Sequence, residues 1–327
     1  MLIATSPARE RLVSVALPRP AVLAVSGGAD SMLMASWLVE RAPLHVRAIA
    51  TFDHGTGTSA RESAALVERW ATERGVPVRV GHATALRATE ASWRAARWAF
   101  LRASSIEFDA PIATAHTEDD QAETVFMRLL RHSGVRGLAG LHAPGPVIRP
   151  LLALSRAEIR EQAAHLQVPF ADDPSNQMRH HLRNRVRLEL LPALEAATPG
   201  FRAWLLAIGE RAAQWRHDVA TAVDDYWAPM VDADETRLTV RRHRSRRPDT
   251  DEASLFWPEV AGRIGVTLDR RGTARVASFS TKQASGLQMP LSGGAIVRSR
   301  RECWTLERMV SPATADSPSD RRAPRHG

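Results

Sequence analysis

The chain has 327 residues, 44% of them apolar and 24% charged, and a formal net charge of +8. No stretch approaches the roughly 20 apolar residues that cross a membrane, and a single cysteine, Cys303, excludes a disulfide framework and a Cys-x-x-Cys metal or redox site. We therefore expect a two-domain cytoplasmic protein.

Lys282 is the only lysine, so nearly all of the positive charge is arginine. This bias fits a polyanionic partner, because guanidinium groups pair with phosphates and stack on bases. It fits the base composition of a genome equally well, and charge alone leaves both explanations open.

Short apolar runs alternate with helical patterns in the first part of the chain, as repeated strand–helix units do. Strands are predicted at 21–25, 46–52, 76–80 and 112–115, and helices at 31–41, 59–74, 89–105 and 118–131. The alternation predicts an α/β fold, a parallel sheet with helices on both faces. Ligands of such sheets bind beyond the carboxyl ends of the strands.

After Pro150 the pattern becomes mainly helical. Ser155 and Glu158 have the spacing of a capping box, which opens a predicted helix to about residue 167. Further helices are predicted at 180–191, 203–224 and 253–264, and strands within 295–306. The predicted domains are a catalytic domain at 1–200, a linker helix at 201–225, a small C-terminal α+β domain at 226–310 and a disordered tail at 311–327.

The most informative segment runs from Ser26 to Ser31, Ser-Gly-Gly-Ala-Asp-Ser, between the first strand and the first helix. Gly27 and Gly28 have no Cβ, so backbone N–H groups can close on an anion, and the helix start adds unpaired amides. Asp30 is expected to act on phosphate through Mg²⁺. No Gly-Lys-Ser/Thr follows, so this is not a Walker loop.

This loop resembles the pyrophosphate loop of ATP pyrophosphatases. The resemblance implies that ATP is held by six consecutive residues: Ser26, Gly27, Gly28, Ala29, Asp30 and Ser31. A second copy of its first four letters begins at Ser292, but it lacks the Asp-Ser ending and a following helix, and we expect a turn there.

A second segment, 113–124, reads Ala-Thr-Ala-His-Thr-Glu-Asp-Asp-Gln-Ala-Glu-Thr. Thr117 and Asp120 have capping-box spacing, so a helix should begin here and leave His116 at the mouth of a strand. Asp120 and Glu123 share a helix face. A histidine beside a carboxylate at a ligand crevice suits proton transfer and metal binding. For Asp119 we favour a structural role, since acidic side chains complement a helix N-terminus.

The remaining candidates are less specific. Asp53, after the second strand, could meet a ribose or base, or simply make a turn. Arg94 and Arg97 could hold a nucleotide, and a solvated helix face explains Arg94 equally well. The basic stretch 183–187 could contact phosphates or lie on the surface. His180 and His181 have no matching metal ligands nearby.

Taken together, these segments resemble the tRNA(isoleucine)-lysidine synthetases over about residues 20–200. The matching segments are 26–31, 53–55, 116–124, 128–131, 137–141, 149–152, 155–159, 172–176 and 183–187. The glycine loop alone would indicate only the wider ATP pyrophosphatase (PP-loop) superfamily, and the later segments are more specific.

The resemblance implies a ligase that uses ATP and Mg²⁺ to join free lysine to the wobble cytidine of an isoleucine tRNA with a CAU anticodon. An adenylated cytidine is the intermediate, and AMP and pyrophosphate are released. A homodimer is compatible with the family.

The resemblance also implies roles for the residues that match the motifs of the family. Catalysis is assigned to Asp30, His116, Asp120, Glu123 and Arg97, and Mg²⁺ to Asp30 and Asp120. Asp53 joins the loop in nucleotide binding. Substrate and tRNA contacts are assigned to Arg94, Arg97, Glu123, Arg183, Asn184 and Arg187.

The chain departs from the family pattern in three places. Thr56-Gly57 replaces a usual Leu-Arg pair, Trp98 replaces a usual tyrosine, and one small C-terminal domain stands where longer relatives have two. Arginines at 241, 242, 244, 246 and 247 form a candidate phosphate patch or a basic loop. Three alternatives remain: a tRNA thiolase, a synthetase acting on a small metabolite, and a non-catalytic RNA-binding protein.

Overall fold

The computed structural model describes residues 7–55, 57–83, 89–171, 182–227, 230–242, 249–282, 285–291 and 294–309. The chain divides into two compact units, Met1–Ala213 and Gln214–Gly327, and the division falls inside helix α10 (Phe201–Trp227). Several segments named above lie outside the described residues: Thr56, 172–176, His180 and His181, Arg244, Arg246 and Arg247, Ser292 and Gly293, and 311–327.

The first unit contains the predicted parallel sheet. Its four strands run in the order β3-β2-β1-β4 and are β1 (Ala21–Ala24), β2 (Val46–Asp53), β3 (Val78–His82) and β4 (Ile112–Thr114). Leu23 at the centre pairs with Ile49 on one side and Ala113 on the other. The four predicted strands are thereby confirmed within two residues.

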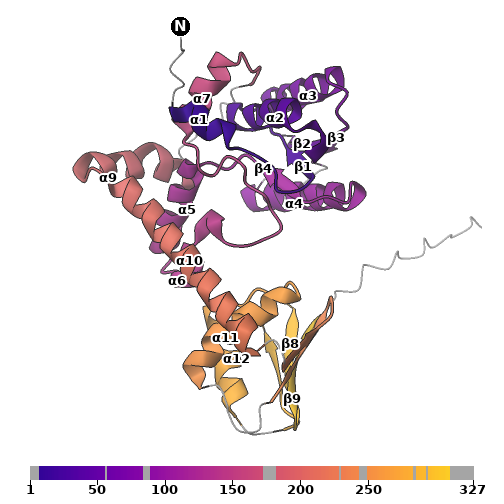
Figure 1. The fold of residues 1–327 in the computed structure, drawn as a ribbon, viewed down its shortest axis with the longest axis vertical. Helices are drawn as coiled ribbons and strands as arrows, with labels where there is room; N and C mark the ends of the chain where they lie inside the picture. Colours follow the sequence, from indigo (N-terminus) through magenta and orange to yellow (C-terminus); the bar gives the residue numbers. More distant parts are fainter. Residues whose placement is uncertain are drawn as a thin grey trace, which may run out of the picture. The chain divides into compact units, whose positions relative to one another are not determined.

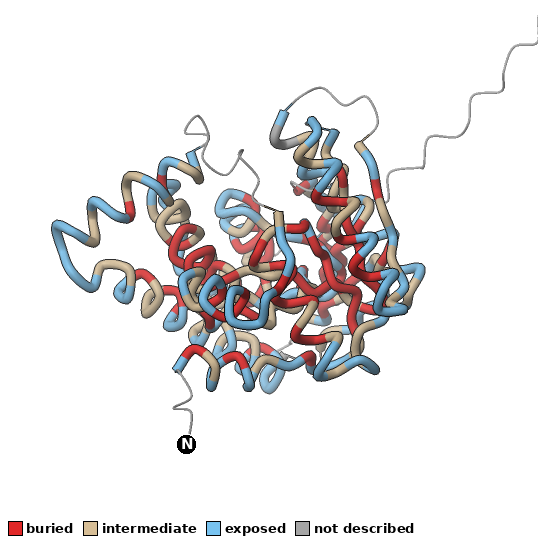
Figure 2. The backbone as a smooth tube through the Cα atoms, turned by 90° about the horizontal axis from the view of Figure 1, so that it is seen from above, coloured by how far each residue is buried: buried red, intermediate tan, exposed pale blue. Residues whose placement is uncertain are grey.

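Helices cover both faces of this sheet (Figure 1), as predicted: α2 (Ala29–Arg41) and α3 (Thr58–Glu73) on one, α4 (Glu90–Glu107) on the other. The alternation of side chains along β1 explains this. Leu23 packs in one core cluster with Met32 of α2, whereas Val22 packs in another with Leu101 of α4. Strands β1 and β4 are buried along their whole length, whereas the edge strand β3 is buried only at Gly81. Figure 2 colours the backbone by burial.

The strand order reverses between β1 and β4. Strands β2 and β3 lie on one side of β1, and β4 pairs with its other side. Ligands of open α/β sheets bind at such a switch point, beyond the carboxyl ends of the strands. Residues 25–31 and 115–120, which follow β1 and β4, therefore lie side by side there.

The rest of the first unit is helical. Its remaining helices and 3₁₀ turns are α1 (Pro7–Val13), η1 (Pro43–His45), α5 (Glu118–Leu130), α6 (Val135–Leu138), η2 (Gly140–His142), α7 (Arg156–His165), α8 (Leu182–Arg185) and α9 (Leu191–Ala197). The helix predicted at 180–191 is wrong as a continuous α-helix, because a π-helical turn, Val186–Leu190, separates α8 from α9. Pro192 in the first turn of α9 has no N–H to donate, which accounts for the changed hydrogen bonding.

In its described residues the second unit combines a five-stranded antiparallel sheet with helices α11 and α12 and the end of α10, the expected α+β class. The sheet order is β5-β6-β9-β8-β7, with β5 (Val231–Ala233), β6 (Arg237–Arg241), β7 (Gln288–Leu291), β8 (Ala295–Ser299) and β9 (Cys303–Arg308). Helices α11 (Thr250–Arg263) and α12 (Arg270–Thr281) share a core with the sheet, including Trp257, Val276 and Trp304. Strands β7 and β8 pair antiparallel, with Leu291 opposite Ala295, and the turn expected from Ser292 falls on residues outside those described.

Across the described residues, no helix combines the length and the apolar character needed to span a membrane.

Candidate functional site

The glycine loop after β1 has the geometry of an anion cradle. Gly27 has a φ of +89°, a backbone conformation that side chains disfavour. Helix α2 begins at Ala29, two residues earlier than predicted, and its N-cap, Gly28, offers no side-chain hydrogen bond to the first amides. The cap residue thus leaves these amides to other acceptors, such as an anion. The Ser31 hydroxyl donates to Gly28 O at 3.0 Å and accepts from Ser26 N at 3.1 Å, which fixes the loop.

Gly27→Ala should damage this loop more than its backbone strain alone explains. An added Cβ would lie 2.9 Å from Ser63 Cβ on α3, so strain and overlap together should cost roughly 2–4 kcal/mol and weaken ATP binding. Gly75→Ala is the matched control. Its φ is +65° with nothing within 4 Å of an added Cβ, and about 1 kcal/mol is expected. Urea unfolding and ATP titration measure both, and equal losses in the two variants would contradict the close approach.

Asp30 lies in the first turn of α2, beside the cradle. Its Oδ2 is 3.7 Å from Arg156 Nε. Burial raises the pKa of Asp30 to about 6, and Asp120 adds to this while Arg156 opposes it. The Asp30 carboxylate is therefore only partly solvated, and a bound cation would stabilise its negative charge.

Two helix N-termini meet next to this loop. Thr117 caps α5 as predicted: its Oγ1 accepts from Asp120 N at 3.3 Å, and Asp120 Oδ2 accepts from Thr117 N at 2.9 Å. Glu118 N donates to Leu154 O at 2.9 Å, and Arg156 N donates to Asp119 Oδ2 at 2.8 Å. These bonds tie the start of α5 to the start of α7 and bring Arg156 into the site.

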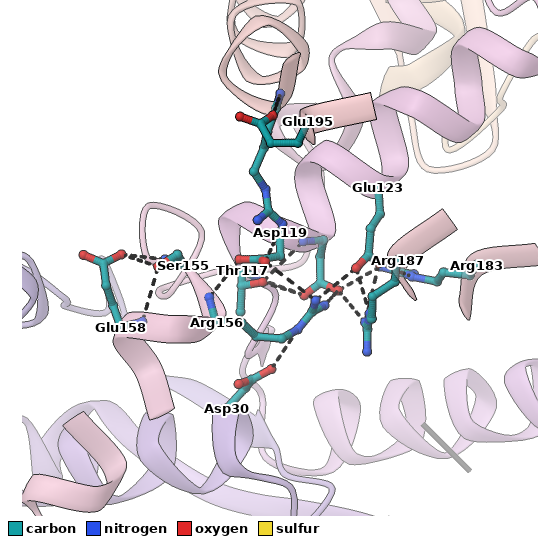
Figure 3. Close-up of polar contacts among 12 residues, drawn as sticks. Asp30, Thr117, Asp119, Glu123, Ser155, Arg156, Glu158, Arg183, Arg187 and Glu195 are labelled. Carbon is teal, nitrogen blue, oxygen red and sulfur yellow. Dashed lines mark hydrogen bonds and ion pairs between the residues drawn. The ribbon is translucent and has the colours of Figure 1, made fainter. Parts of the chain in front are cut away.

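Three arginines donate hydrogen bonds to the carboxylates of Asp120 and Glu123 on one face of α5 (Figure 3). Arg156 donates to Asp120 Oδ1 at 2.7 Å and to Glu123 Oε1 at 3.0 Å. Arg183 donates to the same two side chains, both at 2.9 Å. Arg187 Nε donates to Glu123 Oε1 at 2.8 Å. Asp120 and Glu123 thus share a face, as predicted, and Arg183 and Arg187 meet on it.

Among the described residues, the ion pairs of this cluster join four arginines with four carboxylates: Arg156, Arg183, Arg187 and Arg202 with Asp30, Asp119, Asp120 and Glu123. Burial tends to raise the pKa of Asp120, but Arg156 and Arg183 outweigh it and the pKa is lowered. Glu123 is only 1% exposed. An anionic substrate entering here must displace a carboxylate from an arginine, or bind the outer side of the guanidinium groups.

His116 lies at the end of β4 within reach of these charges. Its Nδ1 is 2.8 Å from Thr114 Oγ1. Burial lowers the pKa of His116 to about 4, against the opposing effect of Asp120. The imidazole is thus neutral at pH 7 and can hydrogen bond to a phosphate or a sugar, but it carries no charge to offer it.

The other predicted residues are placed less decisively. Asp53 Oδ1 accepts from Gly55 N at 2.8 Å, which fits its turn role. Both Arg94 and Arg97 lie on α4, where Arg94 is exposed. Burial lowers the pKa of Arg97, and Arg97 in turn helps lower that of His116. Asn184 is half-buried on α8 between Arg183 and Arg185.

Sequence reasoning missed the central cation of the site, Arg156, and the second role of Asp119. Besides complementing the helix dipole, Asp119 accepts from the Arg156 backbone and pairs with Arg202 of α10. The available signal was the capping box at Ser155, which places Arg156 at the first residue of α7.

The carboxylates differ in their fitness for Mg²⁺. In the described parts of the chain, no three His, Cys, Asp or Glu side chains converge as a metal cage. Mg²⁺ in phosphate sites commonly takes only one or two carboxylates and keeps its water and phosphate ligands. Asp30, 29% exposed with an arginine no closer than 3.7 Å, fits that role. Asp120 does not fit it in this arrangement, because arginines occupy its Oδ1 and Thr117 its Oδ2.

Comparison with known proteins agrees with this geometry. Residues 8–194 match the model of the PP-loop domain family. A tRNA(Ile)-lysidine synthase from Parasynechococcus marenigrum is 36% identical over 292 residues, covering 84% of this chain and 85% of that protein. One from Salinispora tropica is 33% identical and covers 87% and 86%. Among solved structures, a U34-tRNA thiolase from Methanococcus maripaludis with its [4Fe-4S] cluster resembles the fold. Its TM-score is 0.51 at 21% identity, covering 63% of this chain and 77% of that one.

Proposed function

The chain belongs to the tRNA(Ile)-lysidine synthase family of PP-loop proteins, and we propose how its site divides the work of that reaction. The enzyme joins lysine to the wobble cytidine of an isoleucine tRNA at the expense of ATP. The observation that carries the assignment of roles is the meeting of the glycine loop and the α5 face at the switch point between β1 and β4.

The first step is adenylation of the cytidine. Its ring carbonyl oxygen attacks the α-phosphorus of ATP, and the bond to the β-phosphate oxygen breaks to release pyrophosphate. The amides at the start of α2 and the loop Ser26–Ser31 hold the pyrophosphate. Mg²⁺, when bound, would neutralise the phosphate charge that develops, and Asp30 is the residue that would hold it. His116, being neutral, orients a phosphate or sugar oxygen.

The second step is displacement of AMP. The lysine ammonium first loses a proton to solvent, and the neutral amine attacks the activated ring carbon. The bond to the AMP oxygen breaks, AMP leaves as an anion, and the newly attached nitrogen loses its second proton to solvent. Asp120 and Glu123 supply the negative charge that attracts a lysine ammonium. In this structure arginines occupy both carboxylates, so lysine must exchange with one of these partners as it binds.

The arginines on the open side of the cluster would hold tRNA. Arg183 is 33% exposed and can offer its outer edge to a phosphate. The wobble base lies in a loop, so it enters the crevice without breaking a base pair. Arg94 and Arg97 of α4 and Asn184 of α8 are further candidates for contacts with the nucleotide and its backbone.

Arg183→Ala should weaken tRNA binding. We expect KM for tRNA to rise about tenfold and the salt dependence of binding to fall by about one phosphate contact. Arg185→Ala is the control, because Arg185 is 54% exposed and, among the described residues, forms its ion pair with Glu189 one helical turn away, at 3.9 Å. Filter binding at several salt concentrations measures both. An equal effect of the two substitutions would show that this stretch contributes general charge only.

The experiment for the function itself combines the protein with ATP, labelled lysine and a CAU-anticodon isoleucine tRNA transcript. Labelled tRNA is expected, and a methionine tRNA with the same anticodon should stay unlabelled. Absence of label under conditions where the protein is folded and binds ATP would overturn the proposal.

The thiolase alternative finds no support in the site, since the only cysteine, Cys303, lies on β9 of the second unit. The enzyme would work in the cytoplasm, where tRNA, ATP and free lysine meet, and it would pair as a homodimer, which light scattering can test.

A further inference from the structure

Gln121 is fully buried on α5, one residue after Asp120 and on another face of the helix from Asp120 and Glu123. Its Nε2 donates to Ala139 O at 3.1 Å, and its Oε1 accepts from Leu141 N at 2.6 Å. Both polar ends of the side chain are thus engaged by the backbone of one short segment, Ala139–Leu141.

Two glycines make room for this side chain. Gly140 has a φ of +62°, and a Cβ there would lie 2.9 Å from Gln121 Nε2 and closer still to Oε1. A Cβ at Gly209 of α10 would also lie closer than 3.0 Å to Nε2, a distance that real Cβ atoms do not tolerate. We call Ala139, Gly140, Leu141 and Gly209 the Gln121 socket.

The chain just before this segment contacts α5 a second time, farther along the helix. Arg128, two turns beyond Gln121, donates to Gly137 O. Val125, between them, would be 3.2 Å from a Cβ at Gly209. Positions 121, 125 and 128 form one stripe of the helix. The stripe is fixed by hydrogen bonds and close packing, while the stripe of Asp120 and Glu123 faces the arginines.

We propose that Gln121 is a positioning residue whose amide, seated in the socket, fixes the rotation of α5 and so aims Asp120 and Glu123 at the arginines. Side-chain ends lie roughly 6 Å from a helix axis, so a turn of about 10° moves a carboxylate by about 1 Å. A shift of that size breaks hydrogen bonds of 2.7–3.0 Å such as those from Arg156. Displacements of this order cost catalysis heavily.

This inference rests on the proposed function for its catalytic readout. Gln121→Met keeps the length of the side chain and removes both hydrogen bonds. We expect kcat to fall roughly tenfold or more, with KM for ATP within twofold because the glycine loop follows a different strand. Wild-type kcat in this variant would overturn the inference.

A double substitution distinguishes a positioning role of the Gln121 amide from simple filling of the socket. Gly209→Ala should displace the amide and lower both stability and kcat. In Gly209→Ala combined with Gln121→Ala, the clash with the amide is gone, so part of the stability lost in Gly209→Ala should be regained while kcat stays low. Recovery of kcat together with stability would mean that the amide only fills the socket, and would overturn the inference. Gly262→Ala is the control, a helical glycine of α11 with nothing within 4 Å of an added Cβ.

A measurement that does not depend on turnover tests the role of Gln121 separately from the proposed function. Arg183 and Arg187 each donate an Nε–H to Glu123, at 2.9 Å and 2.8 Å. In Gln121→Met these two groups should exchange with solvent several-fold faster by NMR, and in Gly262→Ala they should not change. Unchanged protection in Gln121→Met would overturn the inference even if the wild-type chain transferred no lysine.

Discussion

Asparagine in place of Asp30 should lower kcat by roughly a hundred- to a thousandfold and leave tRNA binding nearly intact. The amide keeps the shape of the side chain but cannot hold Mg²⁺ beside the glycine loop as a carboxylate does. ATP–pyrophosphate exchange with tRNA present and filter binding measure the two effects. Asp234→Asn is the control, since Asp234 lies in the second unit and accepts from the Thr236 and Arg237 backbone in its own turn. Loss of tRNA binding in Asp30→Asn would indicate a structural role instead.

The same substitution should stabilise the fold at high pH. The pKa of Asp30 is raised from 3.8 to about 6 in the folded protein, so its favourable contribution is complete below about pH 4 and is lost as pH rises through 6. Relative to wild type, Asp30→Asn should gain about 1–3 kcal/mol at pH 8 without Mg²⁺ and nothing near pH 4. Urea unfolding at both pH values tests the sign. A less stable variant at pH 8 would show that Arg156 holds Asp30 more strongly than burial penalises it.

Methionine in place of Arg156 should be the most destabilising change in the site. Arg156, 19% exposed, lies among Asp30, Asp119, Asp120 and Glu123. Removing it leaves buried carboxylates facing one another, which should cost about 3–5 kcal/mol and abolish catalysis. Since Arg156 lowers the pKa of Asp30 and of Asp120, the loss should shrink toward pH 5 as these groups accept protons.

Arg79→Met is the matched control for Arg156→Met. Arg79 pairs with Glu107, and both side chains are more than 40% exposed, so less than about 1 kcal/mol is expected. Urea unfolding of both variants at pH 5 and pH 8 gives the comparison. A loss in Arg156→Met that does not change with pH would assign the effect to packing of the side chain.

Features that depend only on neighbouring residues could be predicted from the sequence. Gly27, Asp30 and the caps at Thr117 and Ser155 are local, because each depends on the backbone within a few residues, and the structure places them as expected. The four strands were similarly accessible, because buried parallel strands are short continuous apolar runs.

Features that depend on tertiary contact were not accessible. Arg156 binds Asp120 across 36 residues of chain, and the bonds from Glu118 N to Leu154 O and from Arg156 N to Asp119 Oδ2 bring the two helix starts together. Helix α12 was missed for a related reason. Gly272 and several Ser and Thr residues give it low propensity, and its apolar positions become a core face only against α11 and the sheet.

The absence of lysine from the arginine cluster has a consequence for chemoselectivity. An adenylated cytidine is an electrophile, and any neutral side-chain amine beside it would compete with the free amino acid. Guanidinium groups stay protonated at every working pH and have no reactive lone pair. Lys282, the only lysine of the chain, lies at the end of α12 in the second unit. On the proposed function, the arginine cluster would meet polyanionic substrates through side chains that cannot themselves attack the activated base.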